Sequence, residues 1–228
     1  NALRGHHMRS VIRSSIGVFI ILMALFISSC VSKEPKPLFT FTYLTDIHVQ
    51  PERHAIDGFN QALASAKVLE PDMILTGGDL IMDALGQSHG RADSLYQLFA
   101  ELTSTVKIPI HNTIGNHEVF GLYEKSGISP DHPEYGKQMF MNRMGLDKPY
   151  YSFDHKGWHF IMLDGIGFTE SRRYYGHIDS LQLLWLTADL ATVGTETPII
   201  MSSHIPLVSV YPQLAKGSQE PVGRGYIL

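Results

Sequence analysis

The sequence predicts an α/β domain built around a parallel sheet. Three short apolar segments with the length of buried strands alternate with two segments that have the periodicity of amphipathic helices. Helical crossovers between successive strands favour parallel pairing with right-handed connections. The chain has 228 residues, of which 44% are hydrophobic, and this is enough for one sizeable domain but not for two large ones.

The first half of the domain predicts a strand, a helix, a strand, a helix and a strand. Residues 38–45 alternate in polarity and are rich in aromatic and β-branched side chains, which is typical of a strand. Residues 55–69 place apolar side chains on one helical face, and residues 73–76 predict a short buried strand. Residues 106–110, which contain Pro109, predict the third strand. The second helix is indicated by an apolar stripe of Leu95, Leu98, Phe99 and Leu102.

The middle of the chain is less regular. Gly, Pro, Asp and Met are mixed from residue 121 to residue 149, and we expect one short helix there, around residues 135–144. Residues 150–154 and 158–164 are strand-like and flank a His-Lys-Gly turn, so they predict a β-hairpin.

A further helix and strand are predicted near the end of the domain. Asp179 and Gln182 form a capping-box-like start for the helix. Residues 198–203 predict another buried strand, and residues 211–228 have the composition of a loop. The buried face of the helix is expected to comprise Leu181, Leu184, Trp185 and Ala188.

Candidate metal ligands follow four of the predicted strands. They are Asp46 and His48, Asp79, Asn116 and His117, and His204. Gly-Asn-His-Glu at residues 115–118 would, by itself, be as typical of a surface turn. Polar side chains at the ends of several strands instead indicate a site at the carboxyl edge of the sheet.

The chemistry of these side chains favours a pair of transition-metal ions. Carboxylate, amide and imidazole donors together suit Mn, Fe or Zn better than Mg or Ca, which prefer oxygen alone. Asp46 and His48 are close enough in sequence to reach the same ion, and one carboxylate such as Asp79 can bridge two ions. Two ions can clamp a phosphoryl group and activate a water between them.

These motifs resemble those of the calcineurin-like metallophosphoesterases. Asp46-x-His48, Gly78-Asp79, Gly115-Asn116-His117-Glu118 and His204 follow that family in order and spacing, over about residues 39–206. The resemblance implies a fold of two packed mixed β-sheets flanked by helices. It also implies hydrolysis of a phosphoester, either a monoester or a diester, by a metal-bridging hydroxide at a dinuclear centre of divalent or trivalent ions.

The resemblance also implies a role for each residue. Asp46 and His48 would bind the first metal, Asp79 would bridge both metals, and Asn116 and His204 would bind the second. His117 would contact the phosphate and protonate the leaving group, a role that suits a side chain with an unperturbed pKa near neutrality.

The sequence departs from the family pattern in two places. The family ends its ligand set with Gly-His-x-His, but no His follows His204, so we expect a truncated chain that lacks the last part of the fold and is weakly active. Met82 stands where many members have an acid that orients the catalytic His, which leaves the group that orients His117 unassigned. The alternative function is a surface lipoprotein that keeps the fold and binds a ligand or partner without turnover.

The N-terminus predicts export and lipidation. A short basic segment precedes an apolar run of 12 residues, 16–27, which is short for a membrane span and suits a signal peptide. Ile27-Ser28-Ser29-Cys30 resembles a bacterial lipobox, so Cys30, the only cysteine, is the predicted lipidation site. We therefore expect a membrane-anchored lipoprotein of the cell envelope, with secretion after ordinary cleavage as the alternative. The predicted segments are a signal peptide at 1–29 with an upstream extension at 1–7, a tether at 30–38, and an incomplete metallophosphoesterase domain at 39–228.

Charge excludes a nucleic-acid-binding surface. Three of the 18 basic residues and none of the 22 acidic residues lie in residues 1–29, so the remainder carries a net charge of −7. Other polar residues have simpler interpretations. His111 is interpreted as an interior or edge histidine, His54 and His89 as solvated loop residues, and Asp164 as part of a turn. Arg172-Arg173-Tyr174-Tyr175 fits either a solvated loop or a contact to a phosphate or base.

Overall fold

The computed structural model describes residues 36–207. The predicted signal peptide, Cys30, most of the tether and the final loop-like stretch lie outside the described residues. None of the helices in the described range is both long enough and apolar enough to cross a membrane.

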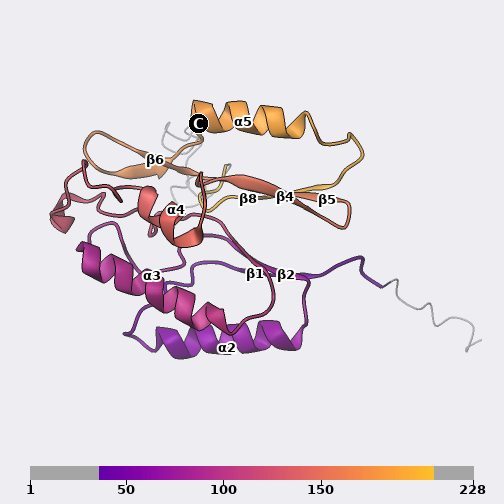
Figure 1. Ribbon diagram of the computed structural model, residues 1–228, viewed down its shortest axis with the longest axis horizontal. Helices are drawn as coiled ribbons and strands as arrows, with labels where there is room; N and C mark the ends of the chain where they lie inside the picture. Colours follow the sequence, from indigo (N-terminus) through magenta and orange to yellow (C-terminus); the bar gives the residue numbers. More distant parts are fainter. Residues whose placement is uncertain (1–35, 208–228) are drawn as a thin grey trace, which may run out of the picture. The chain divides into compact units, whose positions relative to one another are not determined.

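The first sheet is parallel, as the sequence predicts. Its order is β1-β2-β3, with β1 at Phe41–Leu44, β2 at Met73–Thr76 and β3 at Ile110–Asn112. Helices α2 (Ala55–Val68) and α3 (His89–Ser104) form the two crossovers and lie on one face of this sheet (Figure 1).

The second sheet is mixed. Strands β4 (Tyr151–His155) and β5 (Trp158–Met162) form the predicted hairpin, and β8 (Ile199–Ser202) pairs with β5 in parallel. The connecting turn, Lys156 and Gly157, has positive φ at both residues (46° and 80°). This matches a type I′ hairpin, whose twist agrees with that of the strands.

The remaining elements surround the strand ends. A short helix η1 (Glu124–Ser126) and helix α4 (Gln138–Met144) lie between the two sheets in sequence. Strands β6 (Ile166–Phe168) and β7 (Tyr174–Gly176) form a second antiparallel hairpin, and helix α5 (Ser180–Leu190) follows it.

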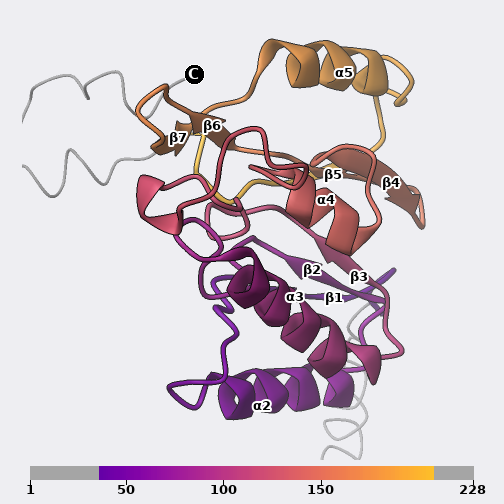
Figure 2. The same ribbon diagram turned by 60° about the vertical axis from the view of Figure 1, so that its left-hand side comes forward.

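The two sheets pack face to face and are covered by helices. Alternation along β2 directs Ile74 into the cluster that contains residues of α2 and α3, whereas Met73 and Leu75 join Phe160 of β5 in the core between the sheets. On the outer face of the second sheet, Ile161 packs with residues of α5. The layers are therefore helices, sheet, sheet and helix, as Figures 1 and 2 show. This confirms the predicted fold of two packed sheets flanked by helices, although the first sheet is wholly parallel in the described residues.

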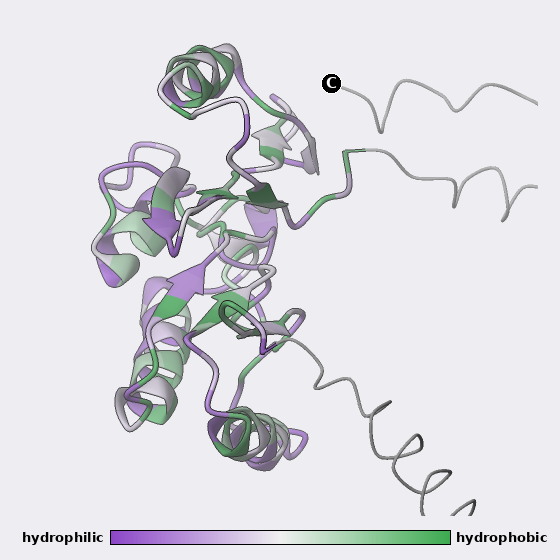
Figure 3. Cartoon of the chain, turned by 90° about the vertical axis from the view of Figure 1, so that its right-hand side faces the viewer, coloured by the Kyte–Doolittle hydropathy of each residue, from purple (hydrophilic) through white to green (hydrophobic). Residues whose placement is uncertain are grey.

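Helix α5 is rotated relative to the prediction. Asp179 caps it as expected, accepting a hydrogen bond from the Gln182 backbone N–H at 2.8 Å. However, Leu181 and Leu184 are 71% and 68% exposed, so assigning them to the buried face was wrong, and hydrophobic residues are visible over much of α5 in Figure 3. The rotation is fixed by Gln182, whose buried amide bonds both the N–H and the carbonyl of Asp164 (2.9 and 2.8 Å). Ala188 is also exposed, whereas Trp185 packs inward.

Two predicted strands also need correction. The third strand begins at Ile110 rather than at residue 106, because Pro109 has no N–H to donate to the ladder and contributes only its carbonyl, which accepts from Ile74 at 2.8 Å. The strand predicted at 198–203 is not fully buried. Ile199 and Met201 are 41% and 44% exposed, because α5 covers the outer face of β5 but not that of β8.

Candidate metal centre

The predicted ligands lie on loops that leave the carboxyl ends of β1, β2, β3 and β8. The loops after β1 and β2 remain hydrogen-bonded beyond the strands. Asp46 N–H donates to the Gly78 carbonyl at 3.1 Å, and His48 N–H donates to the Asp79 carbonyl at 2.9 Å. The sheet ladder therefore continues into the site and fixes the first two loops relative to each other.

Three of the predicted ligands have left-handed backbone conformations. The φ angles of Asp46, His48 and Asp79 are 54°, 49° and 54°. A non-glycine residue in such a sparsely populated region costs on the order of 1–3 kcal/mol and persists only where its surroundings over-determine it. Three such residues in adjacent loops indicate that the fold holds these side chains in place at the expense of local stability.

Three imidazoles converge on one carboxylate oxygen. Asp79 Oδ2 lies 3.3 Å from His204 Nε2, 3.7 Å from His48 Nε2 and 3.9 Å from His117 Nε2. Asp79 is 4% exposed, and the three histidines come from three separate strand ends. This is the convergence that the positions of the motifs predict.

The side chains form two groups that share Asp79. One group is His48, Asp79 and His117, the other is Asp46, Asp79 and His204, and within each the candidate ligand atoms lie within 4.8 Å of one another. Asn116 joins through its Oδ1, which is 3.2 Å from His204 Nε2. The grouping differs from the one implied by the resemblance, which gives Asp46 and His48 to one metal and leaves His117 outside the ligand set. Shared Asp79 and the mixture of nitrogen and oxygen donors fit two transition-metal ions.

A buried carboxylate that the sequence analysis left without a role supports the site. Glu118 is 0% exposed, and its carboxylate accepts backbone N–H groups of Asp79, Leu80 and Gly115 at 2.9, 2.8 and 2.7 Å. It thus ties the loop after β3 to the loop after β2. Burial, followed by the nearby charge of Asp79, raises the pKa of Glu118 to about 7 despite these bonds.

The sequence profile described as calcineurin-like phosphoesterase matches residues 39–224. The chain belongs to the calcineurin-like phosphoesterase family. Metal-dependent hydrolysis of phosphoesters is the general activity that this membership supports.

A solved structure shows the same fold. The crystal structure of a dimetal phosphatase from Danio rerio is similar with a TM-score of 0.53 and 16% identity, over 76% of this chain and 71% of that one. At this identity the likeness concerns the fold alone. No curated protein matches the sequence.

The group that orients His117 in this calcineurin-like phosphoesterase is a backbone carbonyl. His117 Nδ1 is hydrogen-bonded to the carbonyl oxygen of Met82. Because a carbonyl only accepts, Nδ1 must carry the proton, and Nε2 is the ring atom directed toward Asp79. The His117 backbone is held as well, since its N–H donates to Asp79 Oδ1 at 3.0 Å. Met82 therefore supplies through its main chain the support that the sequence left unassigned.

The protonation states of the histidines reflect their contacts. Burial disfavours the charged form of His204, but hydrogen bonds to Asp79 and to the Gly77 carbonyl outweigh it and raise the pKa of His204 to about 9. Burial and the neighbouring His117 lower the pKa of His48. His48 Nδ1 is buried and has no hydrogen-bond partner among the described residues. A metal ion would have to displace the proton of His204, so metal affinity should depend on pH.

Two glycines of the family motifs are required by close approach. A Cβ at Gly115 would lie 2.3 Å from Asp79 Oδ1, and a Cβ at Gly78 would lie 2.8 Å from the His204 ring. Gly78 also has a φ of 92°, which side chains rarely adopt. Packing at the site therefore requires the glycines of the Gly-Asp and Gly-Asn-His-Glu motifs, in addition to the polar residues that its chemistry requires.

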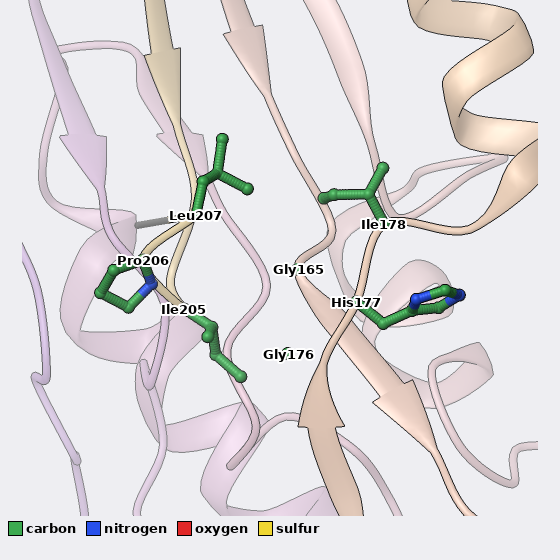
Figure 4. A pocket seen from close by; sticks show the side chains of 7 residues that line it. All are labelled: Gly165, Gly176, His177, Ile178, Ile205, Pro206 and Leu207. Carbon is green, nitrogen blue, oxygen red and sulfur yellow. The ribbon is translucent and has the colours of Figure 1, made fainter. Parts of the chain in front are cut away.

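The segment that carries His204 is held by the β6–β7 region. Ile205 points toward Gly176, where an added Cβ would lie 2.9 Å from Ile205 Cγ2 (Figure 4). The gap lined by Gly165, Gly176, Ile205 and their neighbours has a volume of about 10 Å³, which is no more than a water molecule needs. The gap is too small for a substrate. The packing of Ile205 around it holds the segment that carries His204 in position.

The other polar residues singled out in the sequence lie in structural contacts. His111 stacks on Phe153 with ring centroids 3.7 Å apart, as expected for a packing histidine. His89 is the first residue of α3 rather than a loop residue, and its partly exposed side chain is paired with Glu134 at 2.7 Å. His54 is exposed at the start of α2, and buried Asp164 is paired with Lys137. None of these four belongs to the two groups around Asp79.

Proposed function

We propose that this domain hydrolyses a phosphoester at a centre of two transition-metal ions. The observation that carries the proposal is the convergence of three imidazole nitrogens within 3.3–3.9 Å of one oxygen of buried Asp79. Packing alone does not explain four polar strand ends directed at one point, with three strained residues at two of these ends. The residues that would hold the metals are Asp46, His48, Asp79, Asn116 and His204.

The side chains of the proposed centre have separate roles in hydrolysis. When bound, the two ions would supply an activated water and neutralise charge on the phosphoryl group. Asp79 offers a buried negative charge to both ion positions, and Glu118 holds its loop in place. His117, with Nδ1–H bound to the Met82 carbonyl, has only Nε2 free to exchange a proton with a leaving group. We therefore assign His117 the role of proton donor rather than ligand, although its Nε2 lies 3.9 Å from Asp79 Oδ2, against 3.7 Å for His48.

Hydrolysis of chromogenic substrates tests the proposal. Protein beginning at Cys30 is assayed with a phosphomonoester and a phosphodiester in the presence of Mn²⁺, and bound metal is counted by mass spectrometry. Asp79→Asn should abolish metal binding and turnover together. His117→Ala should retain metal and lower kcat by about 10²–10⁴-fold. The exposed Asp57→Asn on α2 is the matched control.

Two outcomes would overturn this function. If Asp79→Asn hydrolyses both esters at the wild-type rate, the activity does not arise at this centre. If the wild-type protein binds two metals but turns over neither ester, the alternative of a surface lipoprotein that binds without catalysis is favoured.

We further propose that the domain is exported and anchored through a lipid on Cys30. The support is the basic segment, the apolar run and the lipobox-like sequence of residues 8–30, all outside the described residues. Metabolic labelling with a fatty-acid analogue should mark the wild type and not Cys30→Ser. An unlabelled protein recovered from the medium would instead indicate an ordinary cleaved signal.

A further inference from the structure

A second concave site lies beside the loops that carry the metal centre. A groove of about 420 Å³ is lined by two short segments, Tyr123–Lys125 and Ser171–Arg173. The first segment follows the Gly-Asn-His-Glu loop, and the second is the tip of the β6–β7 hairpin. Figure 2 shows this hairpin close to the loop that precedes α4. The groove is therefore built from two elements that are distant in sequence.

Backbone hydrogen bonds connect this groove to His117. The His117 carbonyl accepts from Ala84 N–H at 2.8 Å, and the Ala84 carbonyl accepts from Gly121 N–H at 2.9 Å. The next link joins the Leu85 carbonyl to Tyr123 N–H at 2.8 Å. The wall of the groove is thus an extension of the same two loops that hold Asp79 and His117.

Arg172 fixes the opposite wall in place. Its guanidinium donates to the carbonyls of Leu122 (2.8 Å), Gly121 (2.6 Å) and Ile128 (2.9 Å). Three of the five N–H groups of the guanidinium make these bonds, and they hold the hairpin tip against the loop after β3. The groove is consequently preformed, with Arg172 as its support.

Two other cations remain available in the groove. Arg173 lies over the Tyr123 ring at 5.5 Å and Lys125 lies 5.8 Å from the same ring centroid. Within residues 36–207 neither forms an ion pair with a carboxylate, although this part of the chain has an excess of acids. The stem of Lys125 crosses Gly86, where an added Cβ would lie 2.0 Å from its Cε. Glu124 is the single acidic residue of the lining, so the groove has a net positive charge.

We propose that this groove binds a second anionic group of the phosphoester substrate, a phosphate in addition to the one that is hydrolysed. This inference rests on the proposed function and deepens it, because it assigns the substrate to the class of bisphosphates. Lys125 and Arg173 supply charge-assisted hydrogen bonds, and the Tyr123 ring holds both cations at one side of the groove.

A binding measurement tests the groove without any turnover. Inorganic pyrophosphate is titrated calorimetrically into metal-free protein, so that metal ions cannot contribute. The variant Lys125→Met/Arg173→Met should bind about tenfold more weakly at low salt. Lys67→Met/Lys107→Met, which removes two exposed lysines elsewhere, should bind like the wild type. Gly86→Ala, which displaces Lys125 without removing charge, should weaken binding as well.

Kinetics then distinguish a substrate group from a free anion. An alkyl monophosphate is compared with alkyl bisphosphates of increasing length, in the Mn²⁺-loaded protein. The ratio of kcat/KM for the best bisphosphate to that for the monophosphate should fall about tenfold in Lys125→Met/Arg173→Met.

If pyrophosphate binds the variant and the wild type equally, the groove is not an anion site. If binding is lost but the ratio is unchanged, the groove takes a free anion and the substrate assignment is wrong. Absence of all turnover in a wild type that still binds pyrophosphate would instead refute the proposed hydrolysis.

Discussion

At the scale of single residues, backbone groups position the site as much as side chains do. Glu118 gathers N–H groups from two loops, and the Met82 carbonyl holds the ring of His117. The carbonyl at residue 82 is present whatever side chain stands there. This explains how the domain can lack the acid that many calcineurin-like phosphoesterases have at that position and still orient its histidine.

The role of Met82 gives a sharp prediction. Met82→Ala keeps the carbonyl, so kcat should stay within about a factor of two of the wild type, as for a substitution away from critical contacts. Met82→Pro should lower kcat strongly. The Met82 N–H donates a hydrogen bond to the Val49 carbonyl at 3.1 Å, and proline removes this donor. Both are measured with the chromogenic esters. A large loss of activity in Met82→Ala would show that the side chain, not the carbonyl, supports His117.

Glu118 should be required for stability. Glu118→Gln presents an amide N–H₂ to backbone N–H groups that need an acceptor, which costs about 1–3 kcal/mol for the donors left unsatisfied. The free energy of unfolding is measured by urea denaturation, with exposed Glu101→Gln as the control. Equal stability of the two variants would contradict the bonding role assigned to Glu118.

At the scale of elements, α5 is attached to the second sheet by polar contacts. Buried His159 of β5 contacts Asp189 of α5 at 2.9 Å and Asp154 of β4 at 2.7 Å. Ser152 also donates to Asp189 at 2.7 Å. Together with Gln182, these contacts explain why α5 turns a polar edge inward and leaves leucines exposed.

The His159 contacts make stability depend on pH. Burial tends to lower the pKa of His159, but the two aspartates outweigh it and raise the pKa. A raised histidine pKa adds stability that is complete below about pH 6.5, the unfolded value, and is lost as pH rises through the folded pKa. The difference in unfolding free energy between wild type and His159→Gln should therefore be larger at pH 6 than at pH 9.

The sequence predicts which polar side chains lie together where these side chains directly follow strands, as they do in the group of Asp46, Asp79 and His204. Asp46, Asp79 and His204 were predicted to meet because each follows an apolar strand, and parallel strands end at one edge. The role of Glu118 was not predicted, because three of its four partners lie 37–39 residues away and all four are main-chain groups, which do not depend on residue type. The rotation of α5 was not predicted for the same reason. The Gln182 side chain is hydrogen-bonded to the backbone of Asp164, and these bonds override the apolar pattern of the helix.

At the scale of the whole domain, the candidate metal ligands come from both sheets. Asp46, Asp79 and Asn116 follow strands of the first sheet, whereas His204 follows β8 of the second. The Thr113–Ser202 hydroxyl contact of 2.7 Å crosses the same boundary. Binding of ions should therefore stabilise the packing of one sheet on the other.

Metal removal tests this link. A ligand at a hundredfold excess over its Kd stabilises a folded protein by about 2.7 kcal/mol, or about 5–10 °C in Tm for a domain of this size. Mn²⁺ should raise the Tm of the wild type by this amount and a chelator should reverse it, as followed by differential scanning fluorimetry. An equal rise in Asp79→Asn would mean that the stabilising ions bind elsewhere.

The separation between Asp79 and His204 has a consequence beyond catalysis. Asp79 and His204 follow strands of different sheets, yet Asp79 Oδ2 lies 3.3 Å from His204 Nε2. This distance therefore depends on how the two sheets are aligned. Any slip of one sheet over the other, including one caused by a change in the core around Phe160, would change this short distance. The proposed activity should therefore depend on the alignment of the two sheets, and it should decline before the fold itself is lost.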